Sequence, residues 1–338
     1  MIAITEIELK KLLEKLKDNP EDLDLINQIA IVFFENPSMM NDNEDLKYFE
    51  LAYSTRKTIK SAHNLAWYLY FEWGEQNRSI EIQKETIKLN PSSFFPYYLL
   101  GYMLLEKEHF KEALDFLLIA NQKEERQDII HNLGCCYYHL DKIGQAKDCF
   151  KLAANEYDYE NRSLYNLALT EFNLGNIEKT KDIAGVLFHS IEPKVHKTIS
   201  GYEVGLLYFL LEDFAMATQC LVKQGINGID LIDWKELSYS LFLTDKNKWK
   251  NQLIKGNQER LEWISEIKNN HEDWVFESEE EKQERLNELN YEIQERDKLL
   301  KTGISKPQIN LKERIWMEHC GCMLFDCKQH GNIANDNF

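Results

Sequence analysis

The sequence predicts an all-α protein, an α-solenoid in which antiparallel helix pairs stack one on the next. Three observations lead to this prediction. Glycine and proline, with 14 and 6 residues among 338, are too scarce for the many turns of a β-sandwich. Hydrophobic residues make up 43% of the chain and charged residues 29%, so the chain can bury a core. Two rows of small residues recur with a period near 34 residues, and no stretch has the sustained alternation of a strand.

The first 20 residues predict an amphipathic helix that covers the start of the array. Asn19-Pro20 ends this helix. Its apolar residues fall on one face: Ile7, Leu9, Leu12, Leu13 and Leu16. We therefore assign residues 1–20 to an N-terminal capping helix.

The repeats themselves are predicted over residues 21–265. The first row of small residues has intervals of 35, 33, 34 and 37 residues: Ala66, Gly101, Gly134, Ala168 and Gly205. A second row follows at intervals of 34, 33, 34 and 37 residues: Ser79, Ala113, Ala146, Thr180 and Ala217. Small residues let the two helices of a pair approach closely, and one pair cannot cover its own apolar face, so pairs stack.

The second, third and fifth repeats are well formed, and the third reads Ile130-x2-Leu133-Gly134-x2-Tyr137, followed by Ala146-x3-Phe150. This resembles the tetratricopeptide repeat, a 34-residue helix pair with the pattern W-x2-L-G-x2-Y, then A-x3-F, then P. The fourth repeat departs from the pattern, with Glu171 where an aromatic residue is usual and Thr180 in place of alanine. The resemblance implies a right-handed solenoid of about five to seven repeats, with a groove lined by the first helix of each pair.

This register predicts a partner-binding groove of amide and aromatic side chains: Asn64, Trp67, Tyr98, Tyr102, His131, Asn132, Tyr138, Tyr165, Asn166 and Tyr202, with His63 beside them. The three asparagines occupy one slot in three repeats. They resemble the asparagine ladder with which some members of the family hold an extended peptide, because an amide offers both a donor and an acceptor. In the alternative interpretation, the asparagines cap or pack helices and the aromatic rings belong to the core. The family's carboxylate clamp needs basic residues, for which only Lys60 and Arg162 are candidates.

Residues 266–302 form a strongly acidic segment with a helical pattern. Four apolar residues fall on one face, which predicts a helix that caps the last repeat: Leu286, Leu289, Ile293 and Leu300. The acidic face is interpreted as a solvated surface, with docking of a basic partner as the alternative.

Residues 303–338 are predicted to be a linker followed by a Cys/His tail. The spacing Cys320-x-Cys322-x4-Cys327-x2-His330 offers three thiolates and an imidazole, which is the ligand set of a closed zinc site, with His319 as an alternate ligand. One Zn²⁺ is therefore the only expected cofactor. Two alternatives stay open, namely a reactive dithiol and a tail held by packing alone. Trp316, Met317, Leu324 and Phe325 are expected to dock on the last helices.

The net charge of the chain and the motifs that it lacks limit the classes of function that it can have. A net charge of −17 disfavours nucleic acid and anionic membranes as partners. The start of the sequence lacks an export signal and no stretch could span a bilayer, so a cytoplasmic location is expected. No catalytic motif is present, which favours a non-catalytic scaffold that binds a protein or peptide. The alternatives are a zinc-dependent regulator or immunity-type inhibitor, and an enzyme with an unrecognised site. The sequence does not predict the oligomeric state.

Overall fold

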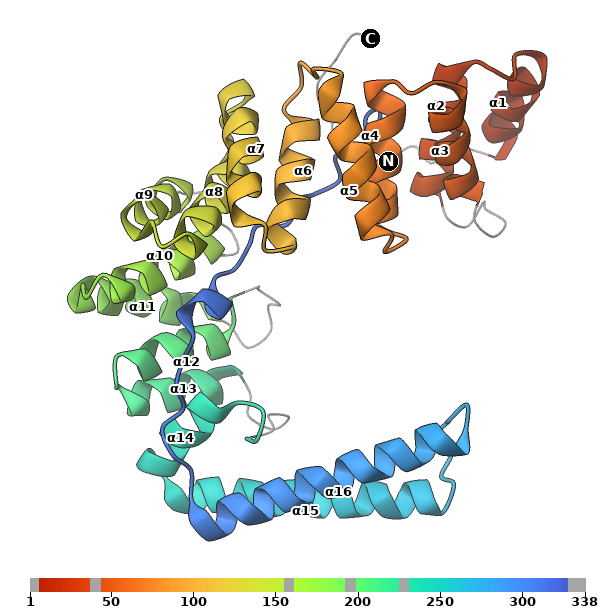
Figure 1. The fold of residues 1–338 in the computed structure, drawn as a ribbon. Helices are drawn as coiled ribbons and strands as arrows, with labels where there is room; N and C mark the ends of the chain where they lie inside the picture. The colour runs from red at the N-terminus through yellow and green to blue at the C-terminus, as the bar shows by residue number, and fades with distance from the viewer. Residues whose placement is uncertain (1–5, 37–43, 155–160, 192–198, 225–230, 328–338) are drawn as a thin grey trace. The chain divides into compact units, whose positions relative to one another are not determined.

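The computed structural model describes residues 6–36, 44–154, 161–191, 199–224 and 231–327. In that part of the chain every regular element is a helix, and successive helices pack in pairs that stack on one another, so the prediction of an all-α solenoid is confirmed (Figure 1). The chain divides into two compact units. Unit 1 joins the chain up to Ala153 with the segment that begins at Met317, and unit 2 runs from Ala154 to Trp316.

Unit 1 is built from four helix pairs and one preceding helix. Helix α1 (Glu6–Asp18) packs on α2, and the pairs are α2/α3, α4/α5, α6/α7 and α8/α9. Their bounds are α2 (Leu23–Glu35), α3 (Glu44–Thr55), α4 (Ile59–Phe71), α5 (Gln76–Lys88), α6 (Phe95–Glu106), α7 (Phe110–Lys123), α8 (Gln127–His139) and α9 (Ile143–Ala153).

Unit 2 continues with two further pairs, α10/α11 and α12/α13, and ends in a long helical hairpin, α15/α16. Helix α14 lies between α13 and α15. The bounds are α10 (Arg162–Asn173), α11 (Ile177–Ser190), α12 (Gly201–Leu210), α13 (Phe214–Gln224), α14 (Lys235–Thr244), α15 (Lys246–Lys268) and α16 (Glu279–Thr302), followed by a short 3₁₀ helix, η3 (Leu311–Arg314). The acidic helix α16 buries Leu286 and Leu289 against Ile264 and Ile267 of α15.

A left-handed residue closes the turn inside each of five successive pairs. These residues have positive φ and follow one another at intervals of 34, 33, 34 and 37 residues: Gly74, Glu108, Asp141, Gly175 and Glu212. In four of them the next backbone N–H returns to the helix five residues earlier, for example from His109 to the carbonyl of Leu104 at 2.9 Å. This arrangement satisfies helix C-terminal carbonyls that would otherwise lack donors. The turn geometry therefore keeps the same period as the small residues.

Close contact inside the pairs depends on the first row of small residues. A Cβ atom at Gly134 would lie 2.7 Å from Cε1 of Phe150, and one at Gly101 would lie 2.7 Å from Cγ of Leu117. Real Cβ atoms do not approach carbon atoms so closely, so α6/α7 and α8/α9 pack at a separation that only glycine permits.

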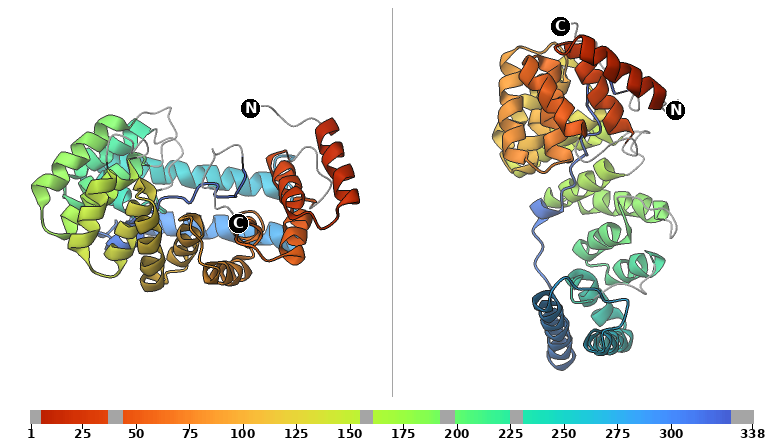
Figure 2. Two further views of the ribbon diagram at one scale, coloured as in Figure 1. Left: turned by 90° about the horizontal axis from the view of Figure 1, so that it is seen from above. Right: turned by 90° about the vertical axis from the view of Figure 1, so that its right-hand side faces the viewer.

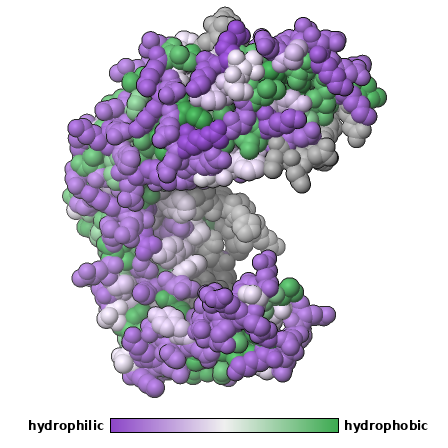
Figure 3. Space-filling view, turned by 45° about the vertical axis from the view of Figure 1, so that its right-hand side comes forward, coloured by the Kyte–Doolittle hydropathy of each residue, from purple (hydrophilic) through white to green (hydrophobic). Residues whose placement is uncertain are grey.

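The surface that Figure 3 presents is mainly hydrophilic, with hydrophobic residues in small scattered areas, as expected of a chain with a net charge of −17. Within the described ranges, no helix combines the length and apolar character needed to cross a bilayer.

Candidate peptide-binding groove

The first helices of the pairs in unit 1 are buried on more than the face that meets their partner helices. Every residue of α6 from Phe95 to Leu105 is buried. A helix that is apolar and buried all round must be covered on all sides. The cover over α4, α6 and α8 is the segment Met317–Cys327, which we call the tail. It has no regular secondary structure and lies along these helices in the order opposite to that of the repeats (Figures 1 and 2).

Two asparagine amides of unit 1 bind the tail's backbone in both directions. Asn132 donates from Nδ2 to the carbonyl of Glu318 at 3.0 Å and accepts the Glu318 N–H on Oδ1 at 2.9 Å. Asn64 makes the same pair with Phe325, at 3.2 and 2.8 Å. Both asparagines are fully buried. Each amide therefore pairs with the N–H and the C=O of a single residue, as a residue of a neighbouring strand does.

Unit 2 uses the same arrangement on its own segment. Asn166 of α10 donates to the carbonyl of Trp316 at 2.7 Å and accepts the Trp316 N–H at 3.0 Å. The preceding residues, 303–316, which we call the strap, place Ile309, Leu311 and Ile315 on the core of unit 2. The slot that the sequence identified in three repeats is thus a backbone-binding position in all three.

Side chains of the groove add hydrogen bonds to the tail. The indole of Trp67 donates to the carbonyl of Gly321 at 3.3 Å, and His63 contacts the carbonyl of Met323 at 3.0 Å through Nε2. The Tyr102 hydroxyl donates to Glu106 at 2.7 Å and lies 3.2 Å from Nδ1 of His319. With the two asparagines, these contacts engage the tail backbone at four residues.

His63 is held in its neutral form. Its Nδ1 lies 3.1 Å from Nε2 of Gln83, which also donates to the carbonyl of Pro96 at 2.8 Å and is therefore the donor of the pair. Consequently the proton of the neutral ring is on Nε2, where it is donated to Met323. Complete burial is the main cause that lowers the pKa of His63 from 6.5 to about 4.

A closed ring pocket holds Phe325 at the turn of the tail. The Phe325 ring lies 4.9 Å from the His63 ring and 5.7 Å from the Phe95 ring, and the side chain is 2% exposed. The next residue, Asp326, has a φ of 67° and forms an ion pair with Lys60 Nζ at 2.8 Å. Lys60 was one of the two basic groove candidates in the sequence, and in the structure it contacts an acidic residue of the tail.

Of the remaining predicted groove residues, some contact the tail or the strap or the asparagines that bind them, and others pack in the core. Tyr98 is buried and its hydroxyl accepts from Asn132 at 3.2 Å, whereas His131 packs edge-to-face on Phe150 of α9, on the side of α8 that meets its partner helix. Tyr138 is fully buried, and Tyr165 belongs to the core of unit 2. Tyr202 accepts from Arg314 of the strap at 2.9 Å. The aromatic row therefore serves partly as a tail-contacting surface and partly as core.

The expectation that the tail docks on the last helices is wrong. Leu324 and Phe325 lie in unit 1, where the tail reaches Asn64 of α4, and Trp316 is bound by Asn166 of α10. Sequence proximity suggested the last helices. The buried asparagines and rings of the groove offer the tail both hydrogen-bond partners and apolar contacts. The apolar face of α16 is not free for the tail, because it already packs on α15.

The predicted zinc ligands are only partly within the described residues, because His330 lies outside them. Cys320 contacts Sδ of Met323 at 3.0 Å, and Cys327 contacts a carboxylate oxygen of Glu35 at 3.4 Å. Hydrogen bonding to the Cys327 thiol raises the pKa of Cys322, as does burial. In the described part of the chain, no group of three or more Cys, His, Asp or Glu side chains is arranged to hold a metal ion.

Zinc binding therefore stays a prediction, and elemental analysis of protein purified without a polyhistidine tag checks it. The sequence pattern predicts one equivalent of zinc that is lost in Cys320→Ser and Cys327→Ser variants, because those thiolates would be ligands. Metal-free protein that keeps the tail docked would mean that packing and hydrogen bonds hold the tail.

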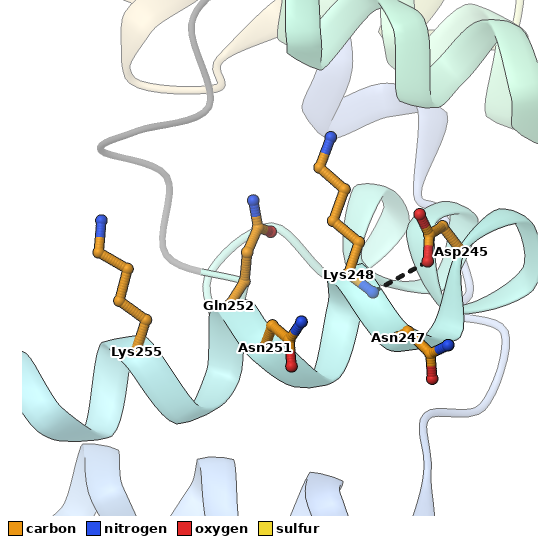
Figure 4. Close-up of a pocket in the computed structure, with 6 residues that line it drawn as sticks. All are labelled: Asp245, Asn247, Lys248, Asn251, Gln252 and Lys255. Atoms are coloured by element: carbon orange, nitrogen blue, oxygen red, sulfur yellow. Dashed lines mark hydrogen bonds between the residues drawn. The ribbon is translucent and has the colours of Figure 1, made fainter.

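A polar recess lies on α15 in unit 2. It is lined by residues of one helical face and its N-cap: Asp245, Asn247, Lys248, Asn251, Gln252 and Lys255 (Figure 4). Asp245 accepts the backbone N–H of Lys248 at 2.9 Å and so caps the helix. Among these lining residues no nucleophile is paired with a base, so they form no recognisable catalytic arrangement.

Solved structures with similar arrangements share little sequence with this chain. The Cut9–Hcn1 hetero-tetramer of the APC/C aligns with a TM-score of 0.49 and 17% identity, over 69% of this chain and 46% of that one, which is under half of its length. YrrB, described as a TPR protein with an unusual peptide-binding site, has a TM-score of 0.47 and 15% identity, over 62% and 96% of the two chains. A tetratricopeptide repeat protein from Parabacteroides merdae ATCC 43184 has a TM-score of 0.47 and 15% identity, over 68% and 89%. No curated protein matches the sequence.

The family assignment depends on the repeats themselves. Residues 127–156 match the family model described as tetratricopeptide repeat, and this stretch contains the pair α8/α9 with its contact between Gly134 and Phe150. The neighbouring pairs keep the same period in their small residues and in their left-handed turn residues. Residues 127–156 therefore form a tetratricopeptide repeat, and the neighbouring helix pairs repeat with the same period.

Proposed function

We propose that the chain is a non-catalytic scaffold that holds an extended segment of a partner protein in the groove formed by α4, α6 and α8. The observation that supports this proposal is the pairing of Asn64 and Asn132 with the N–H and the C=O of single residues of the tail. An amide that donates and accepts in one plane complements the backbone of any residue except proline, whose nitrogen carries no hydrogen. The groove is therefore suited to an extended chain rather than to a small molecule.

The asparagines are buried with the tail in place, so a segment that covers them must supply partners for both amides. A covered donor or acceptor without a partner would cost about 1–3 kcal/mol. The tail satisfies both amides in unit 1. Because the tail belongs to the same chain, it binds the groove intramolecularly. A partner segment must consequently displace the tail, and the two compete for the same amides.

The proposal predicts that weakening the tail opens the groove to a peptide supplied from outside. In the full-length chain, Phe325→Ala removes the ring from its pocket but leaves both asparagines intact. A fluorescent peptide with the sequence of residues 317–327, kept reduced, should bind this released-tail variant more tightly than it binds the unaltered chain. Fluorescence anisotropy measures both affinities, and circular dichroism checks that the variant remains helical.

A second substitution tests the role of the amides. Asn132→Ala in the released-tail variant removes two hydrogen bonds worth about 0.5–1.5 kcal/mol each, so peptide binding should weaken by about 5- to 150-fold. The melting temperature should change only slightly, because the bonds to Glu318 go to the tail and only the bond to the Tyr98 hydroxyl lies within the helices. Asn287→Ala, at an exposed asparagine of α16, is the matched control and should leave binding unchanged. Early melting with unaltered peptide binding would show that Asn132 is structural and would count against the proposal.

A further inference from the structure

The last described residues of the tail form a tight turn, and the groove contacts the individual residues of this turn. The N–H of Cys327 donates to the carbonyl of Leu324 at 3.3 Å, which closes a turn with Phe325 and Asp326 at its centre. Asn64 holds Phe325 at both backbone atoms. The turn is therefore fixed at one place in the groove, and the side chains at its centre are presented to fixed surroundings.

The position of Phe325 selects an aromatic ring. His63 and Phe95 enclose it from α4 and α6, with ring centroids at 4.9 and 5.7 Å, and the side chain retains 2% exposure. Offset and edge-to-face contacts at these distances favour an aromatic group over an aliphatic one of equal area. His63 also has a fixed ring orientation, because Gln83 and the carbonyl of Met323 bind its two nitrogens.

Two independent requirements act on the next position. Its φ of 67° belongs to the left-handed region, which glycine, asparagine and aspartate tolerate better than other residues. The ammonium of Lys60 lies 2.8 Å from the side-chain carboxylate, and its other acidic neighbour, Asp24, is more distant at 3.6 Å. The backbone thus favours a short polar residue and Lys60 favours a negative charge. Aspartate is the residue that meets both requirements.

We propose that the partner of this groove presents an extended segment that ends in a turn, with an aromatic residue followed directly by aspartate at its centre, the pattern of Phe325–Asp326, at the site formed by His63, Phe95 and Lys60. This inference rests on the proposed function, since it names the kind of segment that the groove accepts. The chain's own tail carries the pattern and is the competing ligand. The asparagines supply binding that is independent of sequence, and the pocket with Lys60 supplies the selectivity.

The test uses the full-length released-tail variant, Phe325→Ala, and a set of reduced peptides based on residues 317–327. Changing the peptide's phenylalanine to alanine should weaken binding by about 10- to 100-fold, because a buried ring is lost. Changing its aspartate to asparagine should weaken binding by less than about fivefold, because the left-handed turn is retained and a partly exposed ion pair contributes little. Changing the aspartate to lysine should weaken binding more strongly, and this difference should shrink as salt is raised.

Charge reversal on the protein gives the decisive comparison. Lys60→Glu in the released-tail variant should bind the lysine peptide better than the aspartate peptide, which inverts the original preference. Equal binding of all peptides with continued dependence on Asn132 would overturn this inference and leave the proposed function standing. Failure of every peptide to bind a folded released-tail variant would overturn both.

A test within one chain covers the case in which Phe325→Ala does not fold. Protection of the Phe325 amide from hydrogen exchange reports tail docking, because that N–H is bound by Asn64. Asp326→Lys alone should reduce the protection, and Lys60→Glu with Asp326→Lys should restore most of it. Absence of restoration in the double variant would contradict a direct role for Lys60 in reading the acidic position.

Discussion

Replacement of Gly134 by leucine is expected to destabilise unit 1 by about 3 kcal/mol or more. Even the first carbon of a side chain at this position would lie 2.7 Å from Phe150, and Phe150 is itself fully buried, so neither residue can move aside without opening α8/α9. In a stacked array the strain also reaches α7, which packs on α8. For a unit of about 150–250 residues the melting temperature should fall by about 6–12 °C.

Gly144→Leu is the matched control, because Gly144 lies in the same repeat and is exposed, and a Cβ atom there would meet no atom of the described residues within 4 Å. Thermal unfolding followed by circular dichroism compares the two variants. Equal melting temperatures for Gly134→Leu and the unaltered chain would mean that the helix pair does not depend on the glycine contact, and the repeat register would have to be abandoned.

Acidification is expected to release the tail through His63. Burial lowers its pKa to about 4, whereas the undocked ring has a pKa near 6.5, so between these values the undocked state binds more protons. The stabilisation from neutral His63 is therefore complete above about pH 6.5 and is lost progressively as the pH falls towards 4. At pH 5 the loss has an upper limit of about 2 kcal/mol, or about 30-fold in the docking equilibrium, which is reached when undocking returns the ring fully to water. Protonation would also place an N–H on Nδ1 against the amide donor of Gln83.

Hydrogen exchange at Phe325, followed from pH 7 to pH 5 and corrected for intrinsic rates, measures this effect. His63→Gln keeps a donor for the Met323 carbonyl and does not titrate, so it should remove the pH dependence. His319→Gln, at an exposed histidine of the tail, should preserve it. Docking that is equally strong at both pH values in the unaltered chain would show that the docked tail does not bury the His63 ring.

The fold follows from local features that a sequence displays directly. The small residues at Gly101 and Gly134 recur with the repeat period, and so do the left-handed turn residues Glu108 and Asp141. The small residues act within one helix pair, over a few tens of residues, so their spacing is visible in the sequence, whereas the left-handed φ values of Glu108 and Asp141 were found only in the structure. The acidic helix α16 was likewise recognisable from its apolar face, although its partner, α15, was not specified.

The groove was only partly predictable, for a geometric reason. Neighbouring residues on a helix point about 100° apart, so the register alone does not settle which side the residue before each asparagine faces. His63 contacts the tail, whereas His131, which precedes Asn132 in the same way, packs on Phe150. The aromatic residues did not show from the sequence which helix face lies in the groove and which lies in the core. Tyrosines such as Tyr98 and Tyr165 are apolar enough for a core and polar enough for a groove. The asparagines were more informative because a buried amide requires a specific partner.

By itself, the sequence determined the helix pairs, their period, and the slot shared by Asn64, Asn132 and Asn166. Only the tertiary structure decided that the chain's own residues 316–327 occupy the backbone-binding positions of the two units. Asn64 and Phe325 are 261 residues apart, and the amide recognises peptide atoms that almost every residue possesses. Such a contact leaves no local pattern at either end, because its specificity comes from where the folded helices present the amides and not from the identity of the residue that they bind.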